Sequence, residues 1–411
     1  MVFSNVKDDL LRFGLIISII LNFNTVYYYS EYNFFYGINR ALIVLMILMN
    51  LFSNGVKRDR LKKAIIPALI YYVYLFACMM LIDITTEYRF KEFSYSFLIL
   101  VPLFIILLGT KGKEECIELA KMFVKIMYYL CIISLFFYVF ANILGIIKSS
   151  KYVRFTWSWM DKVKAYFNIY FETQYMGIGK SNTIMPRNSL FFCEPAMFST
   201  LITFGIMMNK IYNKNSKKTL IVFVIVQLTT TSTTGIIVTI IYFALNFIVV
   251  KKNKAIKIVL IPIVALLSFM AVSNMFVEKM DTSSGNTRLD DMVACTKAWQ
   301  KSPITGTGFL NNTEIEKNFS AFRSSNKGLS TSFFVVLAHG GIFLISVYLY
   351  AFIRQVWYSI KKKEWEKTIM FLMYMMIFLT TIFQYSALSM FVVALGIVIG
   401  QYKEEKEVTE G

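Results

Sequence analysis

The chain has 411 residues, of which 57% are hydrophobic and 17% are charged, and its mean hydropathy is +0.57. A soluble core of this size cannot bury so much apolar surface, whereas a lipid bilayer solvates that surface without folding it inward. Five cysteines and one histidine exclude a disulfide framework and a multi-histidine metal site. The net charge of +18 suits an anionic membrane surface, and we expect neither a nucleic-acid partner nor a cofactor.

Segments of about 20 apolar residues predict an all-α, polytopic integral membrane protein with about twelve transmembrane helices. Residues 1–411 are expected to form one membrane domain, with the first span retained rather than cleaved as a signal peptide. The polar sequence Thr229–Gly235 between the seventh and eighth spans predicts a hairpin rather than one long helix. The predicted spans are Leu10–Tyr29, Phe34–Ser53, Ala64–Ile82, Phe93–Gly109, Met122–Ile147, Ser189–Met208, Thr219–Leu228, Gly235–Val250, Ile258–Phe276, Thr331–Ile353, Thr368–Phe383 and Ser389–Gly400.

Lysine and arginine are concentrated in one set of the connections between these spans. That set includes both termini and the runs 57–63, 210–218, 251–252 and 361–363. Because positively charged loops tend to stay in the cytoplasm, both termini are expected on the cytoplasmic face. The two long connections, residues 148–188 and 277–330, then lie on the outer face.

The outer segment 148–188 combines aromatic residues, including Trp157 and Trp159, with basic ones. One interpretation is an interfacial helix anchored by its aromatic belt. The other is a surface that binds an anionic lipid head group or a sugar, because aromatic faces suit pyranose rings and guanidinium groups suit phosphate. The two interpretations are compatible with each other.

The outer segment 277–330 contains a predicted short helix. Thr287 and Asp290 resemble a capping box, and Pro303 limits the far end of the helix. Arg288 would then lie at the helix start, where the helix dipole disfavours a cation. Arg288 is therefore a candidate for a functional role, and an ordinary surface arginine is the alternative.

Ionisable groups near the outer ends of the spans give the strongest functional signal. Glu194 is the one carboxylate inside a predicted span and away from its edges, and burying it requires a partner. Arg40, Arg187 and His339 fall in the same outer half. The alternatives to a functional role are a structural ion pair of Glu194 with Arg40 or Arg187, and helix packing for His339 beside Gly340-Gly341.

A cluster of arginines with one carboxylate suits a lipid-pyrophosphate leaving group attacked by a hydroxyl. Arginine binds phosphate oxygens in a bidentate manner, and a carboxylate in an apolar pocket becomes basic enough to accept the hydroxyl proton. Arginines that stabilise the departing charge remove the need for a metal. We therefore expect metal-independent chemistry, with Arg187, Glu194 and Arg288 in one site.

Two regions resemble motifs of the Wzy-type polysaccharide polymerases and the related O-antigen ligases. Pro186–Phe198 is similar to that superfamily's arginine followed by Glu-Pro at the start of a span. Asn286–Arg288 and Ala298–Phe309 resemble its outer-loop arginine, short helix and Pro-x-x-Gly-x-Gly pattern. Gly341-Ile342 resembles the start of the helix that closes this loop.

The chain departs from the family pattern in two places. Ser232 is followed by Thr233-Thr234, where members often have an arginine. Ser330-Thr331-Ser332 occupies the place of the ligase histidine, and His339 follows a turn or two later. The second departure favours the polymerase assignment over the ligase assignment.

The resemblance implies a multi-pass glycosyltransferase of the bacterial cytoplasmic membrane. Its substrates would be undecaprenyl-pyrophosphate-linked oligosaccharide repeat units, joined on the outer face into a surface polysaccharide such as O-antigen or capsule. A chain-length regulator and a flippase are the implied protein partners. An O-antigen-ligase-type glycan transferase and a lipid-linked oligosaccharide flippase are the alternative functions.

Under this hypothesis Arg187 and Arg288 bind the donor pyrophosphate and stabilise it as it leaves. Glu194 activates the acceptor hydroxyl or holds an arginine in place, and His339 is the second candidate for the base. Arg40, Trp157 and Trp159 are expected to contribute to substrate binding.

Overall fold

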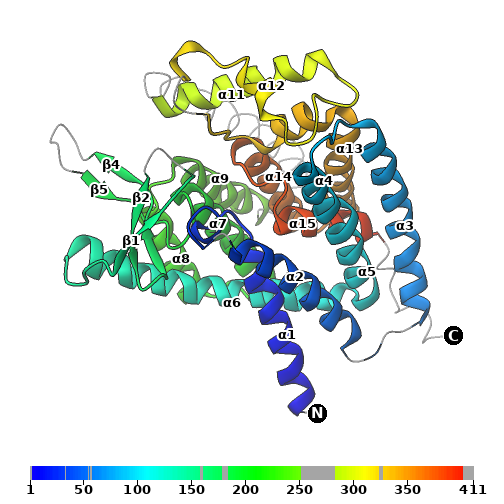
Figure 1. Ribbon diagram of the computed structural model, residues 1–411. Helices are drawn as coiled ribbons and strands as arrows, with labels where there is room; N and C mark the ends of the chain where they lie inside the picture. Colours follow the sequence, from blue (N-terminus) through cyan, green and yellow to red (C-terminus); the bar gives the residue numbers. More distant parts are fainter. Residues whose placement is uncertain are drawn as a thin grey trace.

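The computed structural model describes residues 2–32, 34–53, 55, 58–157, 161–177, 184–250, 283–323 and 327–400. Within these residues the chain is mostly helical, with two small antiparallel sheets (Figure 1). Five of the described helical segments are long and apolar enough to cross a membrane: Phe34–Phe52, Arg58–Leu81, Glu87–Lys111, Lys113–Ile143 and Ser332–Lys361. These segments support the membrane protein that the composition predicts.

In the first third of the chain, α5 packs against α2, α3 and α15, and α1 packs against α2 and α6. Two stretches of π-helix, η2 (Ser94–Leu100) and η3 (Tyr138–Ile143), join α4 to α5 and extend α6. The helices of this part are α1 (Val2–Leu21), α2 (Phe34–Phe52), α3 (Arg58–Leu81), α4 (Glu87–Phe93), α5 (Val101–Lys111) and α6 (Lys113–Phe137).

In the rest of the chain, α7 packs against α6, α8 and α9, and α13 packs against α11, α14 and α15. Helices α11 and α12 lie together at one end of the molecule, as Figure 1 shows. The helices of this part are α7 (Pro195–Tyr212), α8 (Lys217–Thr229), α9 (Thr233–Val250), α11 (Ser283–Lys301), α12 (Asn312–Glu316), α13 (Ser332–Lys361), α14 (Trp365–Thr380) and α15 (Ala387–Val398).

The predicted spans that fall on described residues coincide with helices, although several boundaries differ: α3 begins at Arg58 instead of Ala64, α6 begins at Lys113 instead of Met122, and α13 ends at Lys361 instead of Ile353. Two further differences have a local cause. Helix α1 ends at Leu21 instead of Tyr29, because a turn and a short 3-10 helix, Val26–Tyr28, follow it. Helix α7 begins at Pro195 instead of Ser189, because Glu194 is extended and proline suits the first helical position. The predicted span Ile258–Phe276 lies outside the described residues, and the number of spans and their orientation stay predictions.

The predicted hairpin at Thr229–Gly235 is confirmed. Helix α8 ends at Thr229, α9 begins at Thr233, and Thr231 in between has a positive φ of 50°. Gly235 lets α9 pack closely on α7, because a Cβ there would lie 1.8 Å from Ser199 Oγ. This close packing on α7 holds the turn between α8 and α9 in place.

The outer segment 148–188 is not an interfacial helix, and the chain is therefore not all-α. Strands β1 (Lys151–Arg154), β2 (Lys162–Tyr166) and β3 (Tyr170–Glu172) form a three-stranded antiparallel sheet. Strands β4 (Tyr175–Gly177) and β5 (Ile184–Pro186) form a separate two-stranded sheet. Both sheets lie on one side of the helices in Figure 1.

The physical reason for the sheet is a period of two in the sequence. Val163 and Ala165 in β2 are buried, whereas Lys162 at the start of the strand is exposed and Lys164 is half-buried. A tight turn then reverses the chain, with positive φ at Phe167 (52°) and Asn168 (55°). In a helix the same apolar and charged residues would share a face, and the helix could not bury the apolar ones alone.

The segment after α11 is docked onto a kink in α13. Gly341 has φ 58° and ψ −155°, which breaks the helix there. The freed backbone N–H groups of Ile342 and Phe343 donate to the carbonyls of Pro303 (3.0 Å) and Ile304 (3.2 Å). The Pro-x-x-Gly-x-Gly sequence at residues 303–308 is therefore in direct contact with the Gly341 region.

We expect Gly341→Ala to destabilise the protein by about 1–3 kcal/mol, from strain at positive φ and from overpacking. A Cβ at this position would lie 2.4 Å from the carbonyl oxygen of Ile304. The measurement is the midpoint of thermal unfolding of the purified protein in detergent. Gly37→Ala in α2 is the matched control, because no heavy atom lies within 4 Å of its added Cβ, and an unchanged midpoint for Gly341→Ala would contradict the docking.

Candidate functional site

The guanidinium of Arg187 binds the turn between α8 and α9. Its Nε donates to Thr231 Oγ1 (2.7 Å) and to the carbonyl of Thr230 (3.1 Å), and its Nη2 donates to the carbonyl of Thr231 (3.2 Å). Its Nη1 donates to Gln174 Oε1 (3.0 Å). Because a guanidinium carries five N–H groups, each Nη atom of this half-buried side chain keeps one more for a ligand.

Arg288 binds the same turn from another segment of the chain. Its Nη1 donates to Thr234 Oγ1 (2.7 Å) in the first turn of α9. Arg288 lies on α11 and is half-buried. Two arginines that are far apart in sequence therefore bind hydroxyl groups of residues 231–234.

The predicted start of the helix that carries Arg288 is wrong. Helix α11 begins at Ser283, so Arg288 lies in its second turn, and its end at Lys301 agrees with the limit set by Pro303. Thr287 and Asp290 do not form a capping box. Instead the Asp290 carboxylate accepts a hydrogen bond from the backbone N–H of Ser320 (3.1 Å). This bond holds Ser320 against α11.

Glu194 lies directly before α7 and is half-buried. Its Oε1 accepts a hydrogen bond from Trp157 Nε1 (2.8 Å). Within the described part of the chain Glu194 forms no ion pair with Arg40 or Arg187. The structural ion pair that was the alternative to a functional role is therefore not found. The Trp157 ring in turn packs edge-on against Tyr29, with 4.6 Å between ring centroids.

The charges of Arg187, Glu194 and Arg288 act on one another. Burial lowers the pKa of Arg187, the Glu194 carboxylate opposes that shift, and the charge of Arg288 adds to it. Burial also lowers the pKa of Arg288, against the raising effects of Glu194 and Asp291. Arginine stays protonated through shifts of this kind, so the site presents two cations and one carboxylate.

The structure gives Arg40 a different partner. Its guanidinium forms an ion pair with Glu92, and its Nη1 donates a hydrogen bond to the hydroxyl oxygen of Tyr36 (3.0 Å). It also lies 3.6 Å from the centroid of the Tyr95 ring. In the described structure no contact joins Arg40 to Arg187 or Arg288, and its role in substrate binding stays a prediction.

His339 lies in a second polar cluster. Its Nδ1 is 3.0 Å from the hydroxyl of Tyr385, and its Nε2 is 3.0 Å from Asn312 Oδ1. The amide oxygen of Asn312 accepts, so Nε2 carries the proton and Nδ1 accepts from Tyr385 in the neutral ring. The described contacts of His339 do not include Arg187, Glu194 or Arg288. Trp159, the other residue expected to bind substrate, lies outside the described residues.

Two groups of residues at this site do not stand out in the sequence. The threonines of the α8–α9 turn read as a polar connection, and the run of hydroxyl groups at 229–234 is the signal that could have pointed to them. The other group is Arg323 with Asp290 and Asp291, all buried. Arg323 Nη1 lies 2.7 Å from Asp291 Oδ1 and also donates to the Thr287 carbonyl (3.0 Å), one residue before Arg288.

Asp291 lies on α11, the same helix as Arg288, and is buried against Arg323. Burial raises the pKa of its carboxyl, against the lowering effects of hydrogen bonds from Ser330 and Arg323. A buried charge left without its partner is costly, so this pair holds the segment that contains Arg323 against α11.

The described residues contain no group of three or more His, Cys, Asp or Glu that could hold a metal ion.

No protein-family model matches this sequence, and no curated protein matches it.

We expect Arg323→Gln to destabilise the outer segment by about 3–5 kcal/mol, because Asp291 would remain buried without its cation. The measurement is the rate of limited proteolysis between residues 311 and 330. The double variant Arg323→Gln, Asp291→Asn should recover part of the protection, because it removes the uncompensated charge. Arg154→Gln on the exposed strand β1 is the control, and equal cleavage of Arg323→Gln and wild type would contradict the assignment.

Proposed function

We propose that this protein is a membrane glycosyltransferase that joins lipid-pyrophosphate-linked oligosaccharide units into a polysaccharide on the outer face of the membrane. The observation that carries the proposal is the convergence of Arg187 and Arg288 on one turn, with Glu194 inside their electrostatic reach. Two fixed guanidinium groups match the oxygens of a diphosphate. The resemblance of Pro186–Phe198 to the polymerase and ligase motif supports the same reaction class.

In the proposed reaction the acceptor hydroxyl attacks the anomeric carbon of the donor sugar. A new carbon–oxygen bond forms as the bond to the pyrophosphate oxygen breaks, and the configuration at that carbon inverts. The hydroxyl proton passes to the base, and the polyprenyl pyrophosphate leaves with the negative charge. Arg187 and Arg288 stabilise that charge as it develops, which is where positioned donors contribute most.

We assign the base to Glu194 rather than to His339. Glu194 is half-buried and shares an electrostatic environment with both arginines. Both ring nitrogens of His339 already have hydrogen-bond partners, and the side chain is 1% exposed. His339 would have to lose a partner before it accepted a proton from substrate.

Trp157 is a positioning residue under this proposal. Its indole N–H holds one oxygen of Glu194 at 2.8 Å, and the Tyr29 ring supports the indole from the side. A carboxylate held at one oxygen keeps the other available to the acceptor hydroxyl. The proposed contacts for the sugar rings are the exposed aromatic side chains in the described part of residues 148–188: Tyr152, Phe167 and Tyr175.

Alanine variants of Arg187 and Arg288 should each lower the rate of polymer formation by about 100-fold or more, as expected for lost stabilisation of a developing anion. The measurement is the length distribution of surface polysaccharide in cells that depend on this protein, at equal protein levels. Arg58→Ala is the control, because this exposed arginine begins α3 and belongs neither to the candidate site nor to residues 148–188. Normal polymer from both site variants would overturn the assignment, and normal activity of Arg288→Lys would argue against bidentate binding.

Loss of the protein should lead to accumulation of single repeat units on the outer face of the membrane. The measurement is the size and sidedness of lipid-linked oligosaccharide in a deletion strain, using a glycan-binding probe that does not cross the membrane. Units confined to the cytoplasmic face would instead indicate a flippase. Long polymer still attached to the carrier lipid would indicate a ligase.

A further inference from the structure

A cavity of about 320 Å³ lies between α1, α6 and the start of α8. Its lining includes Lys121, Lys125 and Tyr129 from α6, Asp9 from α1 and Thr219 from α8. It shares no lining residue with the candidate functional site. By the distribution of lysine and arginine, this is the cytoplasmic end of these helices.

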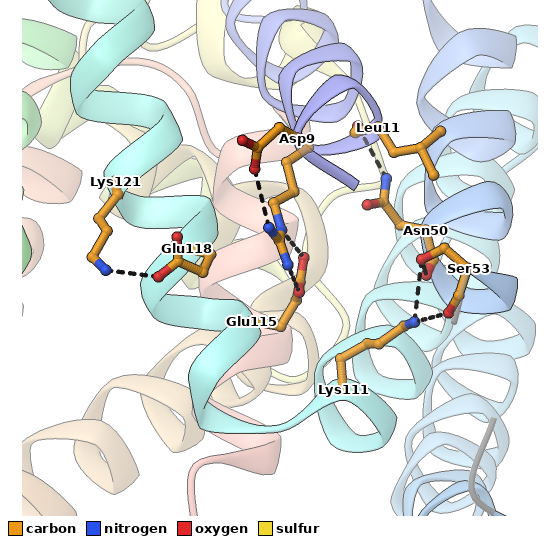
Figure 2. Close-up of polar contacts among 9 residues, drawn as sticks. Asp9, Leu11, Asn50, Ser53, Lys111, Glu115, Glu118 and Lys121 are labelled. Carbon is orange, nitrogen blue, oxygen red and sulfur yellow. Dashed lines mark hydrogen bonds and ion pairs between the residues drawn. The ribbon is translucent and has the colours of Figure 1, made fainter. Parts of the chain in front are cut away.

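The acidic residues around the cavity are neutralised locally. Lys121 Nζ lies 2.7 Å from Glu118 Oε1, and Arg12 Nη1 lies 3.2 Å from Asp9 Oδ1. Arg12 also forms a two-pronged pair with Glu115, at 2.8 and 2.7 Å. Figure 2 shows these contacts along α6, with Asp9 on the adjoining helix.

The cations are not all neutralised. Lys125 lines the cavity, is exposed, and forms no ion pair with any described residue. Lys217 and Lys218, both exposed, begin α8 directly before Thr219. The side chain of Ser216 caps α8 by accepting a hydrogen bond from Thr219 N–H, so the positive potential at this end comes mainly from the lysine side chains. The cavity is therefore suited to an anion.

An apolar stripe continues from the cavity along the same face of α6. Lys121, Lys125, Tyr129, Ile132 and Phe136 follow a spacing of three or four residues, which keeps them on one face of a helix. The last three are 55%, 41% and 49% exposed, although they are large and apolar. Helix α8 packs against α6 and also exposes apolar residues beyond its lysines: Ile221, Ile225 and Leu228.

We propose that this surface binds one phospholipid with an anionic head group from the inner leaflet. The phosphate group contacts Lys125 and the start of α8, and the acyl chains lie along Tyr129, Ile132 and Phe136. The polar cavity and the stripe together match an amphiphile, whereas a free phosphate would use the cavity alone. The proposal is independent of the glycosyltransferase proposal, because it uses none of its residues.

The test is native mass spectrometry of the full-length protein released from nanodiscs of equal parts phosphatidylglycerol and phosphatidylcholine. Wild type should retain phosphatidylglycerol in preference. Lys125→Ala should lower its retention about fivefold, as expected for one lysine at an anionic membrane surface. Ile132→Ser should lower it as well, because the acyl chains lose an apolar contact.

Lys62→Ala is the matched control, because Lys62 is an exposed lysine at the start of α3 on the same predicted face. It should leave retention unchanged, and all variants should keep the thermal midpoint of wild type. Equal retention of the two lipids, or equal loss in Lys62→Ala and Lys125→Ala, would overturn the proposal. So would displacement by inorganic phosphate with no effect of Ile132→Ser, which would identify a free anion as the ligand.

Discussion

A guanidinium group near a membrane must have most of its N–H groups hydrogen-bonded, and in this chain one short turn meets that requirement for two arginines. The last carbonyls of a helix lack partners within the helix and carry partial negative charge. The carbonyls of Thr230 and Thr231, at the end of α8, bind Arg187 in this way. The hydroxyl of Thr234 at the start of α9 binds Arg288. The arrangement of residues 148–188 and of α11 depends on this turn.

The turn connects segments that are distant in sequence. Arg187 follows the two β-sheets and also binds Gln174, so it ties the β-containing segment to α8 and α9. Arg288 ties α11 to the same place, and the buried pair of Arg323 and Asp291 extends that connection to residues after α12. The docking of Ile304 against the kink at Gly341 then fixes the far end of α11.

Threonine in this turn has a chemical consequence for the site. The resemblance to the polymerase superfamily predicts an arginine after Ser232, and Thr233 stands there instead. A third guanidinium would add to the repulsion that Arg187 and Arg288 already exert on each other. Threonine hydroxyls accept hydrogen bonds from both arginines and bring them together without a further cation. The carboxylate of Glu194 offsets part of the remaining positive charge.

The sequence by itself determined the membrane class, most of the helices and the hairpin at Thr229–Gly235, and it selected Arg187, Glu194 and Arg288 as candidates whose function stays a prediction. These follow from apolar length, from polar interruptions and from the scarcity of ionisable groups in apolar segments. The tertiary structure decided the strands in residues 148–188, the start of α11 and the partners of each charge. Glu92 for Arg40, Trp157 for Glu194 and Tyr385 for His339 depend on contacts between segments far apart in sequence. The apolar pattern is set along one helix or strand, whereas a hydrogen-bond partner is set by how several of them pack.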